Sequence, residues 1–276
     1  MIPARFDYEV AESVEHGIEL LGSRSDAKLL AGGHSLLPLM RLRFAAPSLL
    51  VDIGRLRELS YVRDEGDRLA IGALTRYHDL AREELLRREC AILAHASGLV
   101  GDPQVRHRGT IGGSVAHGDP ASDLPPVLVA LEGELVVRGP SGERRIGAGD
   151  FFRGVFETAL EPQEVLTEVR VPKVGASRWA YEKFSRRAQD WAIVGVAAVG
   201  PHNGRAASVA LTNMGPTPVR ARAVERQLEA GVSPAQAAQA AAEGTSPPSD
   251  SNASAEYRQH LARVLVRRAL ERVLAG

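Results

Sequence analysis

Cysteine is the scarcest feature of this sequence, because Cys90 is the single cysteine among 276 residues. One thiol excludes an internal disulfide, a cysteine-rich zinc site and an iron–sulfur cluster ligated by this chain alone. A single free thiol is consistent with a reducing compartment, so the protein is expected to be cytoplasmic. The eight histidines contain no pair at the helical i, i+4 spacing of a metal site, so no bound metal is expected.

Excess charge and aromatic side chains are also missing. Lysine plus arginine and aspartate plus glutamate both number 34, and aromatic residues make up 5% of the chain. A nucleic-acid-binding protein normally has a basic excess and aromatic stacking platforms, so this class is disfavoured. No apolar run is long enough to span a bilayer. The first ten residues hold Arg5, Asp7 and Glu9 and lack the apolar centre of a signal peptide.

Glycine, in contrast, is abundant, with 27 residues that gather at two places. In the first motif, an apolar strand runs into Ala31-Gly32-Gly33-His34-Ser35. Glycine permits positive φ and close approach of a ligand to the backbone, and successive amides in such a turn can form a concave anion site. A tight turn without a ligand is the alternative for a lone Gly-Gly pair.

The second motif, Thr110-Ile111-Gly112-Gly113-Ser114, repeats the two glycines and the hydroxyl. Two such loops suit a ligand with two linked phosphates. Neither motif has the spacing of a Walker loop or of the Rossmann G-x-G-x-x-G fingerprint. The sequence therefore predicts a pyrophosphate-containing ligand on some other fold.

Three segments are expected along the chain. In the first segment, up to residue 57, helix and strand patterns alternate as in an α/β unit. The second segment, 58–173, contains two hairpins, whose turns are at residues 64–67 and 139–142. A linker at 173–177 precedes the third segment, 178–276. The expected strands are 27–31, 49–53, 60–63, 68–73, 134–138, 143–146, 165–171, 179–185, 193–199 and 207–213. The expected helices are 11–21 with Gly22 as its C-cap, one capped by Thr75 that runs to residue 88, 89–99 with Cys90 inside it, one capped by Ser122 or Asp123, 220–228, 234–242 and 257–274.

The residues of both motifs resemble those of the FAD-binding medium subunit of molybdenum hydroxylases, a family that includes the carbon monoxide dehydrogenase medium subunit and the flavin domain of xanthine dehydrogenase. The resemblance continues, in order, through residues 118–123, 181–187, 190–192 and 213–220. It implies an α+β fold, with a two-lobed α/β FAD-binding domain (1–57 and 58–173). A C-terminal domain (178–276) of a three-stranded antiparallel sheet packed with helices would follow.

The resemblance also implies roles for individual residues. FAD pyrophosphate would lie between Ala31, Gly32, Gly33, His34 and Ser35 on one side and Thr110, Ile111, Gly112, Gly113 and Ser114 on the other. Ser114 stands where the family usually has Asn. The adenosine half would contact His117, Ser122 and Asp123, and the flavin ring would contact Leu166, Lys183 and Trp191. The alternatives are an N-cap role for Asp123, an exposed strand lysine at 183, a core tryptophan at 191 and a backbone-bonding His34.

The resemblance implies an electron-transfer subunit without catalytic residues of its own. A large subunit would carry the molybdenum cofactor and a small subunit two [2Fe–2S] clusters, with the whole complex a dimer of heterotrimers. Electrons would pass from the clusters to FAD and on to an external acceptor. A stand-alone flavin oxidase or dehydrogenase and a cofactor-free assembly module are the alternatives. Five arginines of the last helix are expected on a solvated face: Arg258, Arg263, Arg267, Arg268 and Arg272.

Overall fold

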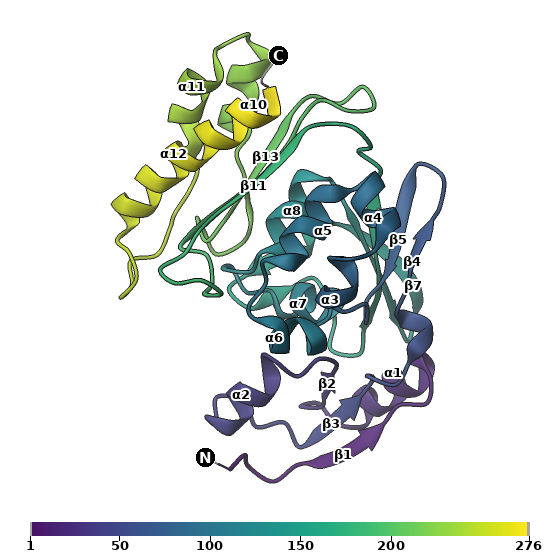
Figure 1. The fold of residues 1–276 in the computed structure, drawn as a ribbon. Coiled ribbons are helices and arrows are strands. Elements are labelled where there is room, and N and C mark those ends of the chain that lie inside the picture. Colours follow the sequence, from purple (N-terminus) through teal and green to yellow (C-terminus); the bar gives the residue numbers. More distant parts are fainter. Residues whose placement is uncertain (1, 275–276) are drawn as a thin grey trace.

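The computed structural model describes residues 2–274, and three parts follow one another along the chain. Figure 1 shows them from the purple N-terminal lobe at the bottom, through a teal middle part, to the green and yellow C-terminal domain at the top. Each part is built on its own main sheet. The α+β class and the succession of a two-lobed α/β region and a helix-packed sheet are confirmed.

The N-terminal lobe is a three-stranded parallel sheet in the order β1-β3-β2. Its elements are β1 (Asp7–Val10), α1 (Val14–Ser23), β2 (Lys28–Leu30), α2 (Leu36–Arg41), β3 (Leu49–Asp52) and the short 3-10 helix η1 (Arg57–Leu59). The Ser13 side chain accepts a hydrogen bond from the His16 amide and so starts α1 at Val14. The helix then continues through Gly22, which is therefore not its C-cap.

The middle part is a five-stranded antiparallel sheet in the order β4-β5-β10-β6-β7, and its apolar side chains share one large core with the helices α5 and α8. Its strands are β4 (Val62–Asp64), β5 (Arg68–Gly72), β6 (Glu134–Gly139), β7 (Gly142–Gly147) and β10 (Val165–Pro172), with a separate pair β8 (Phe152–Gly154) and β9 (Glu157–Thr158). Its helices are α3 (Tyr77–Leu80), α4 (Glu84–Glu89), α5 (Ala91–Gly98), α6 (Pro103–Arg108), α7 (Ile111–His117), α8 (Leu124–Ala130) and α9 (Ala148–Phe151).

The prediction of a single helix from Thr75 to residue 88 is wrong. The chain forms α3 and α4 instead, because Glu83 has extended backbone angles and its side chain caps α4. The Thr75 hydroxyl bonds to the backbone of Tyr61 rather than to a helix. Cys90 lies at the junction of α4 and α5, where burial raises the pKa of its thiol to about 12.

The C-terminal domain is an antiparallel sheet of four strands, one more than expected, in the order β11-β12-β13-β14. The strands are β11 (Trp179–Phe184), β12 (Val194–Val199), β13 (Ser208–Thr212) and β14 (Val219–Arg220), and the helices are α10 (Arg222–Glu229), α11 (Pro234–Ala237), η2 (Ala238–Ala242) and α12 (Ala255–Leu274). The fourth strand is two residues long and pairs with Ala210 and Leu211.

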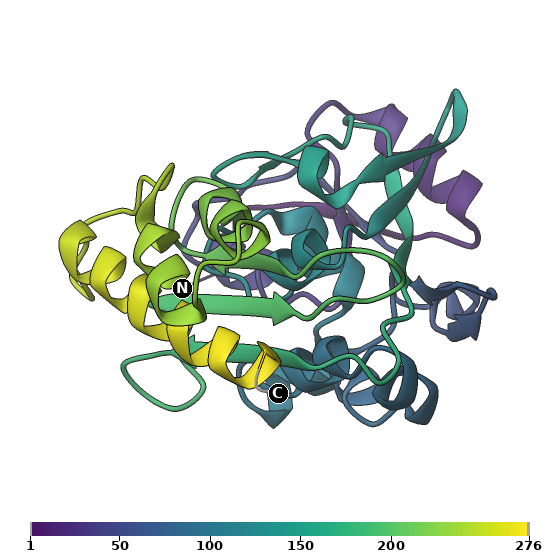
Figure 2. The ribbon, with the colours of Figure 1, turned by 90° about the horizontal axis from the view of Figure 1, so that it is seen from above.

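The C-terminal sheet is covered on both faces, which joins it to the middle part. All six residues of β12 are buried. Val194, Val196 and Ala198 pack with α12, whereas Ala197 and Val199 belong to the core of the middle part. Seen from above, α12 crosses over the strands of this sheet (Figure 2). The C-terminal domain therefore lies directly against α5 and α8, one of which precedes and the other follows the second glycine motif in the sequence.

Arg258 differs from the solvated arginine expected at this position. Its side chain is 1% exposed, donates to the Ile193 carbonyl at 2.5 Å and pairs with Asp250 at 2.8 Å. Arg267, Arg268 and Arg272 are exposed, and Arg263 is partly exposed. Between residues 2 and 274, no helix is long and apolar enough to cross a membrane.

Candidate functional site

The first glycine motif is an open turn between β2 and α2. Gly33 has φ +80°, which places it in the left-handed region that favours glycine. Within residues 2–274, the backbone amides of Gly32, Gly33, His34 and Ser35 find no hydrogen-bond acceptor. His34 and Ser35 are exposed. A run of four unpaired amides in one turn is a ready binding place for an anion.

The second glycine motif is a helix start rather than the expected loop, and the protein itself uses its amides. Thr110 is the N-cap of α7, and its hydroxyl oxygen accepts from the Gly113 amide at 3.1 Å. The Ile111 amide donates to the Thr75 carbonyl at 3.0 Å, and the Gly112 amide to the Ala73 carbonyl at 2.8 Å. The group left fully open to a ligand is the exposed surface of Gly113; the Ser114 hydroxyl is partly buried and contacts Ser122, and the Thr110 side chain is 6% exposed.

Close packing explains two of the glycines. A Cβ on Gly112 would lie 2.7 Å from the Ala73 carbonyl oxygen, and a Cβ on Gly32 would lie 2.4 Å from the Arg108 carbonyl oxygen. Gly32 thus allows the first motif to touch the chain just ahead of the second. A Cβ on Gly113 would come within 3.9 Å of the Ala31 Cβ. The two motifs therefore adjoin, as a ligand that bridges them would require.

The segment 118–123 follows directly after the second motif. Gly118 ends α7 in the left-handed conformation with φ +64°, and the hydroxyls of Ser114 and Ser122 lie 2.9 Å apart. The ring of His117 lies 4.9 Å from that of Phe156. Burial lowers the pKa of His117, which keeps the imidazole neutral at pH 7 and able to both donate and accept.

Asp123 and Lys183 form a buried ion pair between the middle part and the C-terminal domain. The Lys183 Nζ donates to the Asp123 carboxylate at 2.9 Å and to the Leu99 carbonyl at 3.1 Å, and the Tyr181 hydroxyl donates to the same carboxylate at 2.7 Å. Burial raises the pKa of Asp123, and the Lys183 ammonium acts against that rise. Asp123 makes no side-chain cap to α8, and the Lys183 side chain is 9% exposed.

This ion pair brings together two residues that the family resemblance placed at different parts of FAD, Asp123 at the adenosine half and Lys183 at the flavin ring. The two residues are 60 positions apart in the sequence and hydrogen-bonded to each other in the fold. Which part of FAD each would meet stays a prediction. The alternatives of a helix-capping aspartate and an exposed strand lysine are both wrong.

Leu166 and Trp191 lie in contrasting surroundings. Leu166, on β10, is 5% exposed and packs in the main core, so it offers a ligand little surface. Trp191 is 70% exposed in the connection between β11 and β12, which excludes the alternative of a core tryptophan. Its indole is free to meet whatever approaches this connection.

Two residues of the C-terminal domain that were not expected at the site hold the segment 118–123. The Thr212 hydroxyl shares its one hydrogen between the carbonyls of Pro120 and Ser122, at 3.0 and 2.6 Å, and the Asn213 amide donates to the Pro120 carbonyl at 2.9 Å. The available signal was the motif at 213–220, which begins with Asn213.

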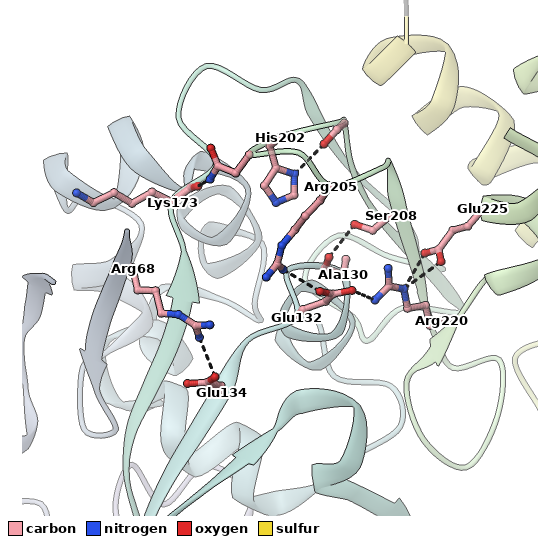
Figure 3. A network of polar contacts seen from close by, with 12 residues as sticks. Arg68, Ala130, Glu132, Glu134, Lys173, His202, Arg205, Ser208, Arg220 and Glu225 are labelled. Carbon is pink, nitrogen blue, oxygen red and sulfur yellow. Dashed lines mark hydrogen bonds and ion pairs between the residues drawn. The ribbon is translucent and has the colours of Figure 1, made fainter. Parts of the chain in front are cut away.

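A second polar network fastens the same two parts together elsewhere. Glu132 lies between Arg205, which it pairs with at 2.8 Å, and Arg220, which in turn bonds to Glu225 (Figure 3). The Ser208 hydroxyl donates to the Ala130 carbonyl at 2.7 Å, at the end of α8. The C-terminal domain is therefore held at both ends of the helix that follows Asp123.

Comparison with known proteins identifies both halves of the chain. Residues 4–174 match the family model described as the FAD binding domain in molybdopterin dehydrogenase. Residues 179–273 match the model described as the CO dehydrogenase flavoprotein C-terminal domain.

Relatives of similar length cover nearly the whole chain. The carbon monoxide dehydrogenase medium chain of Hydrogenophaga pseudoflava is 44% identical over 98% of this chain and 97% of the relative. The glyceraldehyde dehydrogenase medium chain of Sulfolobus acidocaldarius is 36% identical over 99% of this chain and 100% of the relative.

Solved structures agree with these matches. A carbon monoxide dehydrogenase structure from Hydrogenophaga pseudoflava superposes with a TM-score of 0.94 at 44% identity, covering 100% of this chain and 99% of that one. The quinoline 2-oxidoreductase of Pseudomonas putida 86 gives a TM-score of 0.93 at 31% identity with the same coverage. The chain thus belongs to the family of FAD-binding medium subunits of molybdopterin dehydrogenases.

Proposed function

We propose that this protein is the electron-transfer subunit of a cytoplasmic molybdenum hydroxylase complex, in which electrons reach FAD from iron–sulfur clusters on a partner and leave to an external acceptor. The observation that carries the proposal is the run of four unpaired amides at residues 32–35, placed against the second glycine motif. Oriented amides of this kind bind phosphate oxygens. The family match identifies the ligand as FAD.

The donors around the two motifs fit a pyrophosphate. The amides of Gly32, Gly33, His34 and Ser35 are free on one side. On the other side, the Thr110 hydroxyl accepts from Gly113 and can donate its own hydrogen to a ligand. The Ser114 hydroxyl is shared with Ser122, so these two side chains would reorient together. Ala31, Ile111 and Gly112 would support these contacts through their packing.

The remaining residues would orient the rest of the cofactor. His117, Asp123 and Lys183 offer hydrogen-bonding groups near the second motif, and Leu166 and Trp191 offer apolar surface. Bound FAD would supply the exchange of two electrons for single electrons that links a hydroxylase to its acceptor. This chain's own contribution is to bind, orient and shield that group.

The partners follow from what this chain shares with its relatives. The relatives are named as medium chains or subunits of dehydrogenases for carbon monoxide, glyceraldehyde and caffeine, among others. Chains so alike in sequence serve different substrates, which supports a substrate site on another subunit. We expect a large molybdenum subunit and a small iron–sulfur subunit, because Cys90 alone cannot ligate a cluster, and a dimer of such heterotrimers.

The test is the visible spectrum of the purified chain before and after incubation with FAD. We expect flavin absorbance at one FAD per chain. A colourless protein after reconstitution would contradict FAD binding. Turnover of a substrate by the chain alone would favour a stand-alone oxidase, and molybdenum and iron that co-purify with the chain would support the complex.

Two glycine variants locate the site. Gly33→Val forces a branched side chain into a left-handed turn, with its Cβ 2.9 Å from the Leu37 Cδ1, and Gly113→Val puts its Cβ 2.8 Å from the Thr110 hydroxyl oxygen. Each variant distorts a motif that would hold the phosphates, and we expect both to abolish FAD uptake. The matched control is Gly66→Val, because Gly66 has φ +85° and a Cβ added there would meet nothing within 4 Å. It carries the same backbone strain as Gly33→Val away from the site, and should bind FAD normally. Normal binding in both site variants would place the cofactor elsewhere.

A further inference from the structure

Asn213 forms hydrogen bonds both to the segment 118–123 and to the Trp191 connection, which is the loop between β11 and β12 that carries Trp191. Its backbone amide donates to the Pro120 carbonyl at 2.9 Å, and its side-chain Nδ2 donates to the Ala192 carbonyl at 2.8 Å. The residue has φ +59°, a left-handed conformation that asparagine adopts more readily than most residues. This conformation lets one residue bond to two segments that are far apart in the sequence.

The Trp191 connection is held mainly at its C-terminal end, at Ala192 and Ile193. Trp191 is 70% exposed, so packing does little to hold its side chain. The next two residues are buried and bonded: the Ala192 carbonyl accepts from Asn213, the Ile193 amide donates to the Phe184 carbonyl at 2.7 Å, and the Ile193 carbonyl accepts from Arg258. The Phe184 bond joins the two ends of the connection and the Arg258 bond ties it to α12, whereas the Asn213 bond is the one that links it to the segment 118–123.

We propose that Asn213 is a positioning residue that sets the Trp191 connection against the segment 118–123, and that it thereby limits how small acceptors reach the flavin. This inference rests on the proposed function. The backbone N–H of Asn213 bonds to the Pro120 carbonyl and its side-chain amide to the Ala192 carbonyl, so one residue links the two segments through one hydrogen bond each. Without the side-chain bond to Ala192, the connection that carries the Trp191 indole is no longer linked through Asn213 to the segment 118–123.

Two substitutions remove the side-chain bond in different ways. Asn213→Asp keeps the size and the left-handed preference, but sets a carboxylate against the Ala192 carbonyl. Asn213→Gly keeps the backbone conformation and the amide bond to Pro120, and deletes only the side chain. The matched control is Asn203→Asp, because Asn203 also has positive φ (+47°) and donates from its side chain to a carbonyl, that of Lys173 at 2.9 Å.

The experiment compares these full-length chains, loaded with FAD, by three measurements. Flavin absorbance gives the FAD content, and hydrogen–deuterium exchange reports the Ile193 amide, which is bonded to the Phe184 carbonyl next to the Ala192 contact. Stopped flow follows reoxidation of the dithionite-reduced flavin by dioxygen and by ferricyanide. For Asn213→Asp and Asn213→Gly we expect FAD content within about twofold of the parent. We expect amide exchange and reoxidation at least about fivefold faster, as for the loss of one hydrogen bond. Asn203→Asp should match the parent.

Each outcome decides a separate point. Unchanged exchange and reoxidation in both Asn213 variants, with FAD bound, would overturn the positioning role. Equal acceleration in Asn203→Asp would also overturn it, since the effect would then not belong to this connection. A parent chain that takes up no FAD would contradict the proposed function, while the exchange measurement would still test the contact with Ala192. If Asn213→Asp does not fold, Asn213→Gly carries the test.

Discussion

The two glycine motifs have similar sequences but different structural roles. Gly32 and Gly33 lie in an open turn whose amides are unpaired. Gly112 lies in the first turn of α7, bonded to and packed against Ala73, and only Gly113 of that pair is exposed. The first motif has unpaired backbone donors for a ligand. The glycines of the second motif mainly allow close packing, which places the Thr110 and Ser114 hydroxyls next to the first motif.

The difference shows what a Gly-Gly pair requires in each setting. In the turn, positive φ at Gly33 is a backbone requirement. In the helix, the requirement is steric, because a Cβ on Gly112 would collide with a neighbouring strand end. The segment 118–123 that follows the second motif is moreover tied to the C-terminal domain through Asp123 and Lys183. The first motif, which is open, and the second motif, which is anchored, should therefore respond differently to substitution.

The largest effect is expected on the anchored side, from Lys183→Met. Removing the ammonium leaves the Asp123 carboxylate buried without its counter-ion, which costs about 3–5 kcal/mol of unfolding free energy. Burial already raises the pKa of Asp123, and the substitution raises it further. A carboxyl whose folded pKa is raised loses stability as pH rises from its unfolded pKa through its folded pKa. The deficit should therefore be larger at pH 8 than at pH 5.

Urea unfolding of parent and variant at both pH values measures this deficit. The control is the double variant Asp123→Asn/Lys183→Met, which removes both charges while a side-chain oxygen remains to accept from Tyr181. Its deficit should not depend on pH between 5 and 8. A deficit of equal size at both pH values in Lys183→Met would contradict the buried-pair interpretation.

A smaller effect is expected from Gly112→Ala, which tests the packing role of the second motif. The added methyl would lie 2.5 Å from the Ala73 Cβ, and overpacking of this kind costs about 1–3 kcal/mol. The comparison is Gly113→Ala, whose methyl would lie 2.8 Å from the Thr110 hydroxyl oxygen and 3.9 Å from the Ala31 Cβ, so that only the cap has to shift. Thermal unfolding should show the larger loss in Gly112→Ala, and FAD titration should show the larger loss in Gly113→Ala. The reverse pattern would exchange the roles assigned to the two glycines.

The smallest effect is expected from Thr110→Val, which removes the cap of α7 while keeping the shape of the side chain. Loss of an N-cap costs about 1 kcal/mol, and the lost hydroxyl should weaken FAD binding about fivefold. Thr110→Ser keeps the hydroxyl and should restore both values. Chemical unfolding and fluorescence titration with FAD measure them, and a serine variant as weak as the valine variant would show that the methyl group matters rather than the cap.

The parts of the fold that depend on local chemistry were predictable from the sequence. Both hairpins form where turn residues cluster, at 64–67 and 139–142. The strand β14 was missed because two residues carry no periodicity, and pairing with β13 alone defines it. The break between α3 and α4 was missed because Glu83, an ordinary helix former, takes extended angles there. The second motif was taken for a loop because glycine has low helix propensity.

The site was predictable as a set of motifs but not as a set of contacts. Both glycine pairs, the segment 118–123 and the family were found from the sequence. The pairing of Asp123 with Lys183 spans 60 residues, and no local pattern in either segment indicates the other. Arg258 was misplaced for a similar reason, since the carbonyl of Ile193, to which it donates, lies 65 residues away in the sequence. Which individual residues touch FAD stays a prediction.

The bonds from Thr212 to Pro120 and Ser122 also bear on the order of events during synthesis. Donor and acceptor residues are 90 to 92 positions apart, so the segment 118–123 is translated long before the residues that hold it. At about 5–20 residues per second, that interval lasts roughly 5–18 seconds. The first glycine motif can take its shape early from its own sheet, whereas the second half of the cofactor site becomes complete only after residue 212 has been synthesised.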